Sequence, residues 1–142
     1  MDEFRHFVTA QAPVLATVEA ELAAGRKTTH WMWFVFPQLA GLGHSPMARY
    51  YALASLEAAA AYLRHDVLGP RLRRCTNLVN AVEDRTANEI FGTPDDMKFH
   101  SSMTLFARSA PDNAEFRAAL AKYFATREDD KTLALLGVRH AQ

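Results

Sequence analysis

Residues 30–45, HWMWFVFPQLAGLGHS, place four aromatic side chains in six positions and then enter a proline and a glycine-bearing loop. Because every position from Trp31 to Phe36 is apolar, periodicity alone does not separate a buried helix from a buried strand. A strand needs a partner for its backbone N–H and C=O groups, and the sequence offers no second convincing strand. The segment is therefore predicted to be a short helix, buried on nearly all sides and capped by Thr28 or Thr29.

Start and stop signals divide the rest of the chain into short helices. Thr86 and Glu89 have the spacing of a capping box, and so do Asp112 and Glu115. Gly69-Pro70 is expected to separate two helices. Further start signals of the cap-and-proline type stand at Pro13, Ser45-Pro46, Ser55 and Thr93-Pro94. The sequence thus predicts an all-α fold: one compact domain of orthogonally packed short helices over residues 1–142, with an ordered core from about 4 to 137.

Composition limits the classes of function. Lysine plus arginine equals aspartate plus glutamate at 16 each, and this zero net charge argues against sequence-independent nucleic-acid binding. The only cysteine, Cys75, excludes an intrachain disulfide and fits a reducing compartment. The N-terminus lacks the apolar core of a signal peptide, and the longest apolar run is far short of the roughly 20 residues that span a bilayer. We expect a cytoplasmic protein without nucleic-acid or membrane partners.

The aromatic segment supplies the first candidate binding residues. His30 borders the cluster, and its imidazole, together with Trp31, Trp33 and the later Tyr50, could hold a flat heterocycle. The competing interpretation is that these aromatic side chains are simply core.

The loop after the aromatic block is the second candidate. Gly43 allows close backbone approach, His44 follows it, and Ser45 opens a helix whose unpaired N–H groups could receive an anion. The pattern is neither a Walker loop nor a dinucleotide fingerprint. A plain turn followed by a helix cap is the alternative.

The third candidate is a polar stripe in TPDDMKFHSSMTLF, residues 93–106. On a helix, Asp95, Lys98, Ser101 and Ser102 share one face at spacings of three and four. Serine forms helix less readily than alanine or lysine, so two serines in mid-helix indicate that something approaches closely there. A ligand-facing stripe and a seam of small residues for helix packing both fit.

The acidic and histidine side chains are the remaining candidates for catalysis and metal binding. Asp95, Asp96 and Glu89 are the candidates for activating water in a hydrolase. The histidines are scattered without the spacing of a helix-borne zinc site, so neither a metal nor a cofactor is expected. The acidic run at 128–130 is expected to be solvated, with one member capping the last helix.

Four segments also carry a family resemblance: GRKTTHWMWFVFPQLAGLGHSPMARYYAL, EAAAAYLRHDVLGPRLRRC, IFGTPDDMKFHSSMTLF and DDKTLALLG. They resemble a bacterial family of unknown function whose members are sometimes labelled calpastatin-like. The resemblance runs from about Phe4 to Gly137 and implies a mainly α-helical fold, without implying a reaction. A fainter similarity, in the order of an aromatic Tyr-Tyr helix, an Ala-rich helix and a later KF…S…LF helix, is to N-glycosidases that act on riboflavin-pathway intermediates and ADP-ribosylated bases. It implies a nucleotide-like ligand class.

Three hypotheses of function follow. The leading one is a helical domain that binds a small, phosphate-bearing, nucleotide-like ligand. The second is a hydrolase that cleaves the N-glycosidic bond of a nucleotide or ADP-ribosyl derivative. The third is a non-enzymatic structural or oligomerisation module, for which a homodimer is the expected assembly.

Overall fold

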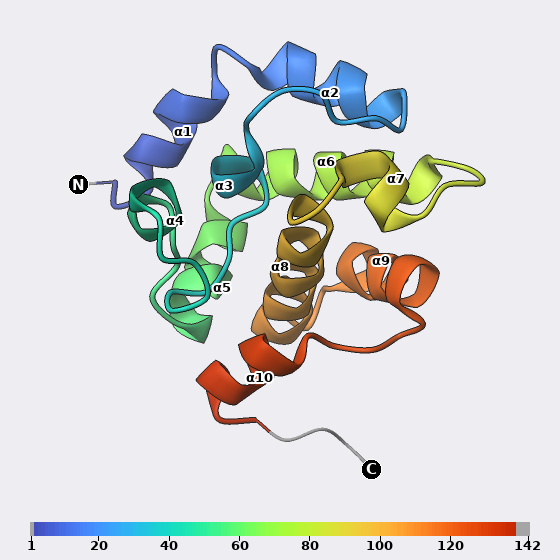
Figure 1. The fold of residues 1–142 in the computed structure, drawn as a ribbon. Coiled ribbons are helices and arrows are strands. Elements are labelled where there is room, and N and C mark those ends of the chain that lie inside the picture. The colour runs from blue at the N-terminus through green and yellow to red at the C-terminus, as the bar shows by residue number, and fades with distance from the viewer. Residues whose placement is uncertain (1, 139–142) are drawn as a thin grey trace.

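The computed structural model describes residues 2–138, which form ten α-helices and, apart from an isolated bridge between Leu39 and Leu53, no β-structure (Figure 1). In this part of the chain no helix combines the length and apolarity needed to cross a membrane. The helices are α1 (Arg5–Gln11), α2 (Leu15–Ala23), α3 (Met32–Val35), α4 (Pro46–Tyr50), α5 (Leu56–Arg64), α6 (Leu68–Ala81), α7 (Ala87–Phe91), α8 (Asp95–Ser109), α9 (Ala114–Phe124) and α10 (Asp130–Leu136).

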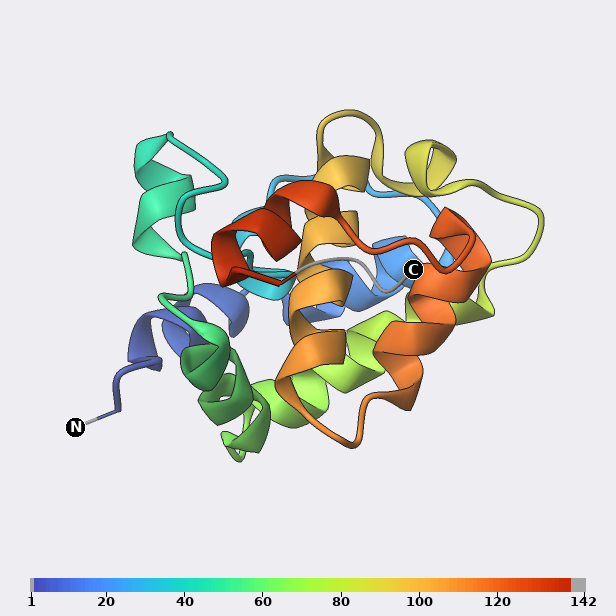
Figure 2. The ribbon, with the colours of Figure 1, turned by 90° about the horizontal axis from the view of Figure 1, so that it is seen from below.

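The central element is α8, which packs against α5, α7, α9 and α10. Behind it α6 packs against α2, α5 and α9, and Figure 1 shows α8 running at a steep angle to α6. Seen from below, α10 lies across α8 (Figure 2). From Ser101 to Ala107 every residue of α8 is buried, and Phe99 contacts Phe36 and Phe91 at ring-centroid distances of 5.1 and 4.7 Å. The predicted all-α fold of short, steeply packed helices is confirmed.

The aromatic segment that begins at His30 does form a short helix, α3, but its start differs from the prediction. Trp31 occupies the N-cap position without a side-chain cap. Thr28 and Thr29 do not cap α3, because their backbone and hydroxyl groups donate to Glu21 of α2 instead. The cap prediction was therefore wrong, since a carboxylate from another helix binds those threonines more completely than a helix end could.

Gly69-Pro70 does not separate two helices, because both residues lie in the first turn of α6. Proline is tolerated there, since the first N–H groups of a helix have no acceptor within it. Gly69 has a packing reason: a Cβ at this position would lie 2.1 Å from the carbonyl oxygen of Leu63. The glycine therefore allows α6 to begin directly against the end of α5.

Some of the helix caps predicted from the sequence are confirmed by the structure, and others are wrong. Thr86 and Glu89 make both hydrogen bonds of the capping box. Glu115 makes no such bond, because its carboxylate pairs with Arg73 at 2.8 Å. Thr93 does not cap α8 either, since its hydroxyl accepts a hydrogen bond from Asn88. In both failures the side chain meets a stronger partner from elsewhere in the fold.

Candidate functional site

One carboxylate is shared by two lysines at the first turn of α8. Asp95 Oδ2 lies 2.8 Å from Lys27 Nζ, and Asp95 Oδ1 lies 3.5 Å from Lys98 Nζ. The Lys27 side chain is 6% exposed, whereas that of Lys98 is 22% exposed. Because two ammonium groups face a single carboxylate, this cluster keeps one uncompensated positive charge, and Lys98 is the member that reaches solvent.

Each of these lysines lies over a tryptophan ring. Lys27 Nζ is 5.1 Å from the ring centroid of Trp31, and Lys98 Nζ is 4.9 Å from that of Trp33. Both distances suit a cation–π contact. Trp31 is buried and Trp33 is partly exposed, so the first pair belongs to the core and the second to the surface.

Glu21 holds the loop that carries Lys27. Its carboxylate accepts hydrogen bonds from the backbone N–H and the hydroxyl of both Thr28 and Thr29, and from Trp31 Nε1, at distances from 2.7 to 3.2 Å. Partial burial would raise the pKa of Glu21, but the hydrogen bonds from Thr29, Thr28 and Trp31 together outweigh it and lower the pKa to about 2. A charged Glu21 thereby fixes the loop beside α8.

The two ends of the aromatic segment lie at the surface. His30 is exposed, and no partner for its ring is found among residues 2–138. Ser45 caps α4 by accepting a hydrogen bond from Ala48 N at 3.1 Å, and His44 beside it is exposed. Gly43 lets the loop pack on α4, because a Cβ there would lie 2.5 Å from Ala48 Cβ. The contact to the α8 lysine comes from the aromatic block itself, through the second tryptophan, rather than from these ends.

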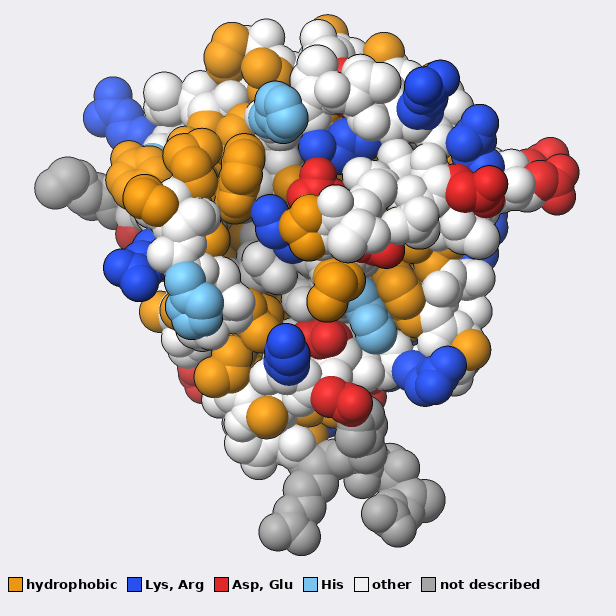
Figure 3. All heavy atoms as spheres, in the orientation of Figure 1, with side chains coloured by type: hydrophobic (Ala, Val, Ile, Leu, Met, Phe, Trp, Pro, Cys, Tyr) orange, Lys and Arg blue, Asp and Glu red, His pale blue; other side chains and the backbone are white. Residues whose placement is uncertain are grey.

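Tyr50 belongs to a different surface. Its ring is 61% exposed and lies against His6 and Tyr51 at centroid distances of 5.0 and 4.9 Å. Figure 3 shows hydrophobic side chains gathered on this side, over α4, and Figure 1 places α4 apart from α8. Tyr50 is therefore not brought together with Lys98.

The two serines of α8 are both buried. Ser101 Oγ lies 3.0 Å from Asp129 Oδ2 and 3.1 Å from the carbonyl oxygen of Met97. Ser102 Oγ has no hydrogen-bond partner in the described part of the chain. The predicted stripe thus has an accessible end at Lys98 and an end at the serines that packs into the fold.

The three candidate carboxylates differ in their partners. Glu89 accepts from Thr86 N at 2.9 Å and so completes the capping box. Asp96 accepts from Met97 N at 2.9 Å and from Asn88 at 3.2 Å. Only Asp95, among the three, lies beside a lysine that reaches solvent. Hydrolytic chemistry at this cluster would therefore depend on Asp95.

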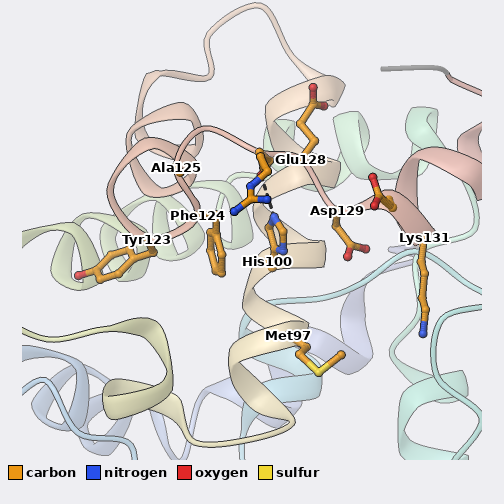
Figure 4. Close-up of a pocket in the computed structure, with 10 residues that line it drawn as sticks. Met97, His100, Tyr123, Phe124, Ala125, Glu128, Asp129 and Lys131 are labelled. Atoms are coloured by element: carbon orange, nitrogen blue, oxygen red, sulfur yellow. Dashed lines mark hydrogen bonds between the residues drawn. The ribbon is translucent and has the colours of Figure 1, made fainter. Parts of the chain in front are cut away.

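A hollow of about 800 Å³ opens next to the same helix, between α8, α9 and the start of α10 (Figure 4). The His100 ring stacks on Phe124, with centroids 3.9 Å apart and planes at 8°, and His100 Nε2 donates to the carbonyl oxygen of Arg127 at 2.7 Å. Figure 4 shows the Asp129 carboxylate at the wall of this hollow, between His100 and Lys131. The lining residues are Met97, His100, Tyr123, Phe124, Ala125, Arg127, Glu128, Asp129, Asp130 and Lys131.

Sequence reasoning missed Lys27 and Glu21 as members of the site. Lys27 stands 68 positions before Asp95, and no local sequence pattern predicts a contact between residues so far apart in the chain. For Glu21 the sequence offered one signal, the adjacent Thr28 and Thr29. Two adjacent threonines can donate hydrogen bonds to a carboxylate as well as cap a helix. The expected cap from the acidic run is confirmed, since Asp129 accepts from Thr132 N at 3.1 Å. Among the residues that the structure describes, no group of His, Cys, Asp and Glu is suited to hold a metal ion.

Comparison with known proteins identifies the family. The model of the family described as "Protein of unknown function (DUF1810)" matches residues 1–136. The chain belongs to the DUF1810 family. It is similar to the conserved hypothetical protein Rv1873 from Mycobacterium tuberculosis, whose crystal structure matches with 60% identity, a TM-score of 0.94, and coverage of 96% of this chain and 98% of that one. None of the curated proteins matches. The predicted resemblance to a bacterial family of unknown function is confirmed.

Proposed function

We propose that this DUF1810 protein binds a small, phosphate-bearing, nucleotide-like ligand at the cluster of Lys27, Asp95 and Lys98. The observation that carries the proposal is the sharing of Asp95 between two ammonium groups. Asp95 lies closer to Lys27 than to Lys98, at 2.8 against 3.5 Å, so the exposed ammonium is the weakly paired one. A lysine in this state has N–H donors left for a phosphate.

Trp33 adds the second chemical feature of the proposed site. The indole beneath Lys98 holds the ammonium in place and, being partly exposed, offers a flat apolar surface beside the anion position. An anionic position next to flat apolar surface suits the phosphate and ring of a nucleotide.

The test is binding of AMP, ADP, ADP-ribose and inorganic phosphate, measured by thermal shift and isothermal titration calorimetry. We expect AMP to raise the melting temperature of the wild type at millimolar concentration. Lys98→Met should weaken its binding roughly tenfold, the effect of removing one charge-assisted hydrogen bond. Arg117→Met, which removes one exposed charge from α9, is the matched control and should leave the affinity unchanged. Failure of every ligand in the panel to stabilise the wild type would overturn the proposal.

Hydrolysis of an N-glycosidic bond at the same cluster is the second candidate. It is favoured by the position of Asp95, which places a carboxylate beside Lys98 and Trp33. In such a reaction the carboxylate would accept a proton from water while the water oxygen bonds to the sugar carbon, and the bond from that carbon to the base nitrogen would break, with its electron pair leaving on the base. Chromatography of the binding mixtures decides it: free base should accumulate with the wild type and not with Asp95→Asn. Binding without release of base restricts the function to ligand binding.

The non-enzymatic alternative makes the opposite prediction for the same panel. A structural or oligomerisation module would bind none of these ligands and would associate through its surface. Light scattering of the ligand-free protein measures this, with a homodimer as the expected assembly. A dimer that ignores the ligands, and whose stability is unaffected by Lys98→Met, would favour the module over the binding protein.

A further inference from the structure

Asp129 combines a structural role with an unused acceptor. Its Oδ2 accepts from Ser101 Oγ at 3.0 Å, from Thr132 N at 3.1 Å and from Thr132 Oγ1 at 2.6 Å. Its backbone N–H donates to Thr104 Oγ1 at 2.9 Å, which fixes the position of the whole residue. Between residues 2 and 138 no donor reaches Oδ1. Because a carboxylate oxygen accepts about two hydrogen bonds, this rigidly held residue offers an open acceptor at the wall of the hollow.

This open acceptor lies near the proposed phosphate position. Ser101, which binds Asp129, follows Lys98 by three residues on α8, a separation of about 4.5 Å along the helix axis. Residues three apart share a helix face. Lys98, which carries the cationic group, and Ser101, which binds Asp129, therefore lie on one side of α8.

The charges around the hollow indicate which part of a ligand each position takes. Besides Asp129, side chains of both charges line it: the carboxylates of Glu128, which pairs with Arg108, and of Asp130, and the cationic groups of Arg127 and Lys131. The Asp129 carboxylate itself would repel a phosphate, whereas the Lys98 ammonium would attract one. A neutral group that donates hydrogen bonds suits Asp129, because a carboxylate oxygen is an acceptor only.

We propose that Asp129 Oδ1 accepts hydrogen bonds from the ribose hydroxyls of the ligand whose phosphate is bound by Lys98. This inference rests on the proposed function and names its ligand class: compounds that contain a ribose 5-phosphate unit. Such a unit carries hydroxyls and phosphate at opposite ends of one sugar, which suits an acceptor and a cation reached from the same side of α8. The part of the hollow beside Met97 and His100 then accommodates a base. Carboxylates bind ribose hydroxyls in the same way in dinucleotide-binding folds.

The experiment compares ribose 5-phosphate with 2-deoxyribose 5-phosphate by calorimetry. The wild type should bind the ribose compound roughly tenfold more tightly, the effect of one hydrogen bond to a charged acceptor. Asp129→Ser keeps a helix-capping oxygen for α10 but removes the second oxygen, so it should bind both sugars equally. Lys98→Met should weaken both while the ratio between them stays near tenfold. Circular dichroism of each variant confirms that the helices are retained.

The outcomes separate this inference from the function on which it rests. Equal binding of the two sugars by the wild type, or an unchanged ratio in Asp129→Ser, would overturn the role of Asp129 and leave phosphate binding at Lys98 intact. No binding of either sugar or of AMP would instead remove the phosphate site itself. Tighter binding of AMP than of ribose 5-phosphate would identify nucleotides, rather than free sugar phosphates, as the source of the shared unit.

Discussion

Trp31 and Trp33 stand two residues apart, and each lies beneath the ammonium group of a lysine, yet their surroundings differ in almost every other respect. Trp31 is 1% exposed, and its indole N–H donates to Glu21 at 3.0 Å. Trp33 is partly exposed, and its lysine is only loosely paired. A lysine over a tryptophan ring is therefore part of the core at Trp31 and part of the surface at Trp33. What distinguishes them is how completely each lysine and each ring is enclosed by its neighbours.

The most direct test of the difference between Trp31 and Trp33 is to remove each ring in turn and compare the losses of stability. Trp31→Ala should lower the free energy of unfolding by about 4 kcal/mol, because it leaves a large cavity and removes one of the hydrogen bonds to Glu21. Trp33→Ala should cost only about 1–2 kcal/mol, since part of its ring already contacts water. Urea unfolding followed by circular dichroism measures both. Equal losses would mean that the second ring is as structural as the first.

Glu21 provides the next test, because it supports only the Trp31 side. Glu21→Gln should cost about 2 kcal/mol at pH 7, when the carboxylate accepts all its hydrogen bonds. The folded pKa of about 2 lies below the ordinary value of 4.5, so this stabilisation is present above pH 4.5 and is lost as the pH falls towards 2. Unfolding measured from pH 7 to pH 2 should therefore show the variant and the wild type converging.

A control on the same helix isolates the effect of the Glu21 carboxylate. Glu19 of α2 pairs with Arg74, whose side chain is 66% exposed. Glu19→Gln should change the free energy of unfolding by less than about 1 kcal/mol, as for other surface ion pairs. A pH dependence in the Glu19 variant equal to that of the Glu21 variant would contradict the special role of the threonine-bound carboxylate.

The two lysines that share Asp95 give the last pair of variants. Lys27→Met should cost about 1–2 kcal/mol, because the nearly buried ammonium makes the closer contact to Asp95. Lys98→Met should cost less than about 1 kcal/mol, since its contact to Asp95 is longer and its side chain more exposed. Thermal unfolding at low and high salt measures both. A larger loss from Lys98→Met would show that this lysine is a structural partner and would weaken its assignment to a ligand.

Several elements of the fold could be predicted because their causes lie within a few residues. The capping box of Thr86 and Glu89 and the cap at Ser45 depend only on side chains that reach the next turn. The α3 helix followed from an apolar run with no strand partner. The wrong caps, at Thr28, Thr29 and Thr93 and in the pair Asp112 and Glu115, have one cause in common: another element supplied a competing partner, which for the last pair is Arg73 bound to Glu115, and local spacing does not reveal it.

The candidate site was predictable only in part. Lys98 and Asp95 were expected on one helix face because their spacing is local, and their contact is observed. That Lys98 lies over Trp33 depends on how α3 docks against α8. The free oxygen of Asp129 likewise depends on Ser101 and Thr132 converging on the other one.

By itself the sequence determined the helical class, most helix positions and the residue types available for binding, because helix caps, prolines and apolar periodicity act over one or two turns. Only the tertiary structure decided that Lys27 and Lys98 share Asp95, which tryptophan is enclosed, and which carboxylate oxygen stays open. Those outcomes follow from competition among partners brought together from distant helices, where burial and hydrogen bonding select one arrangement. A difference of less than 1 Å, between 2.8 and 3.5 Å, then leaves the Lys27 ammonium closely paired with Asp95 and the Lys98 ammonium more loosely paired.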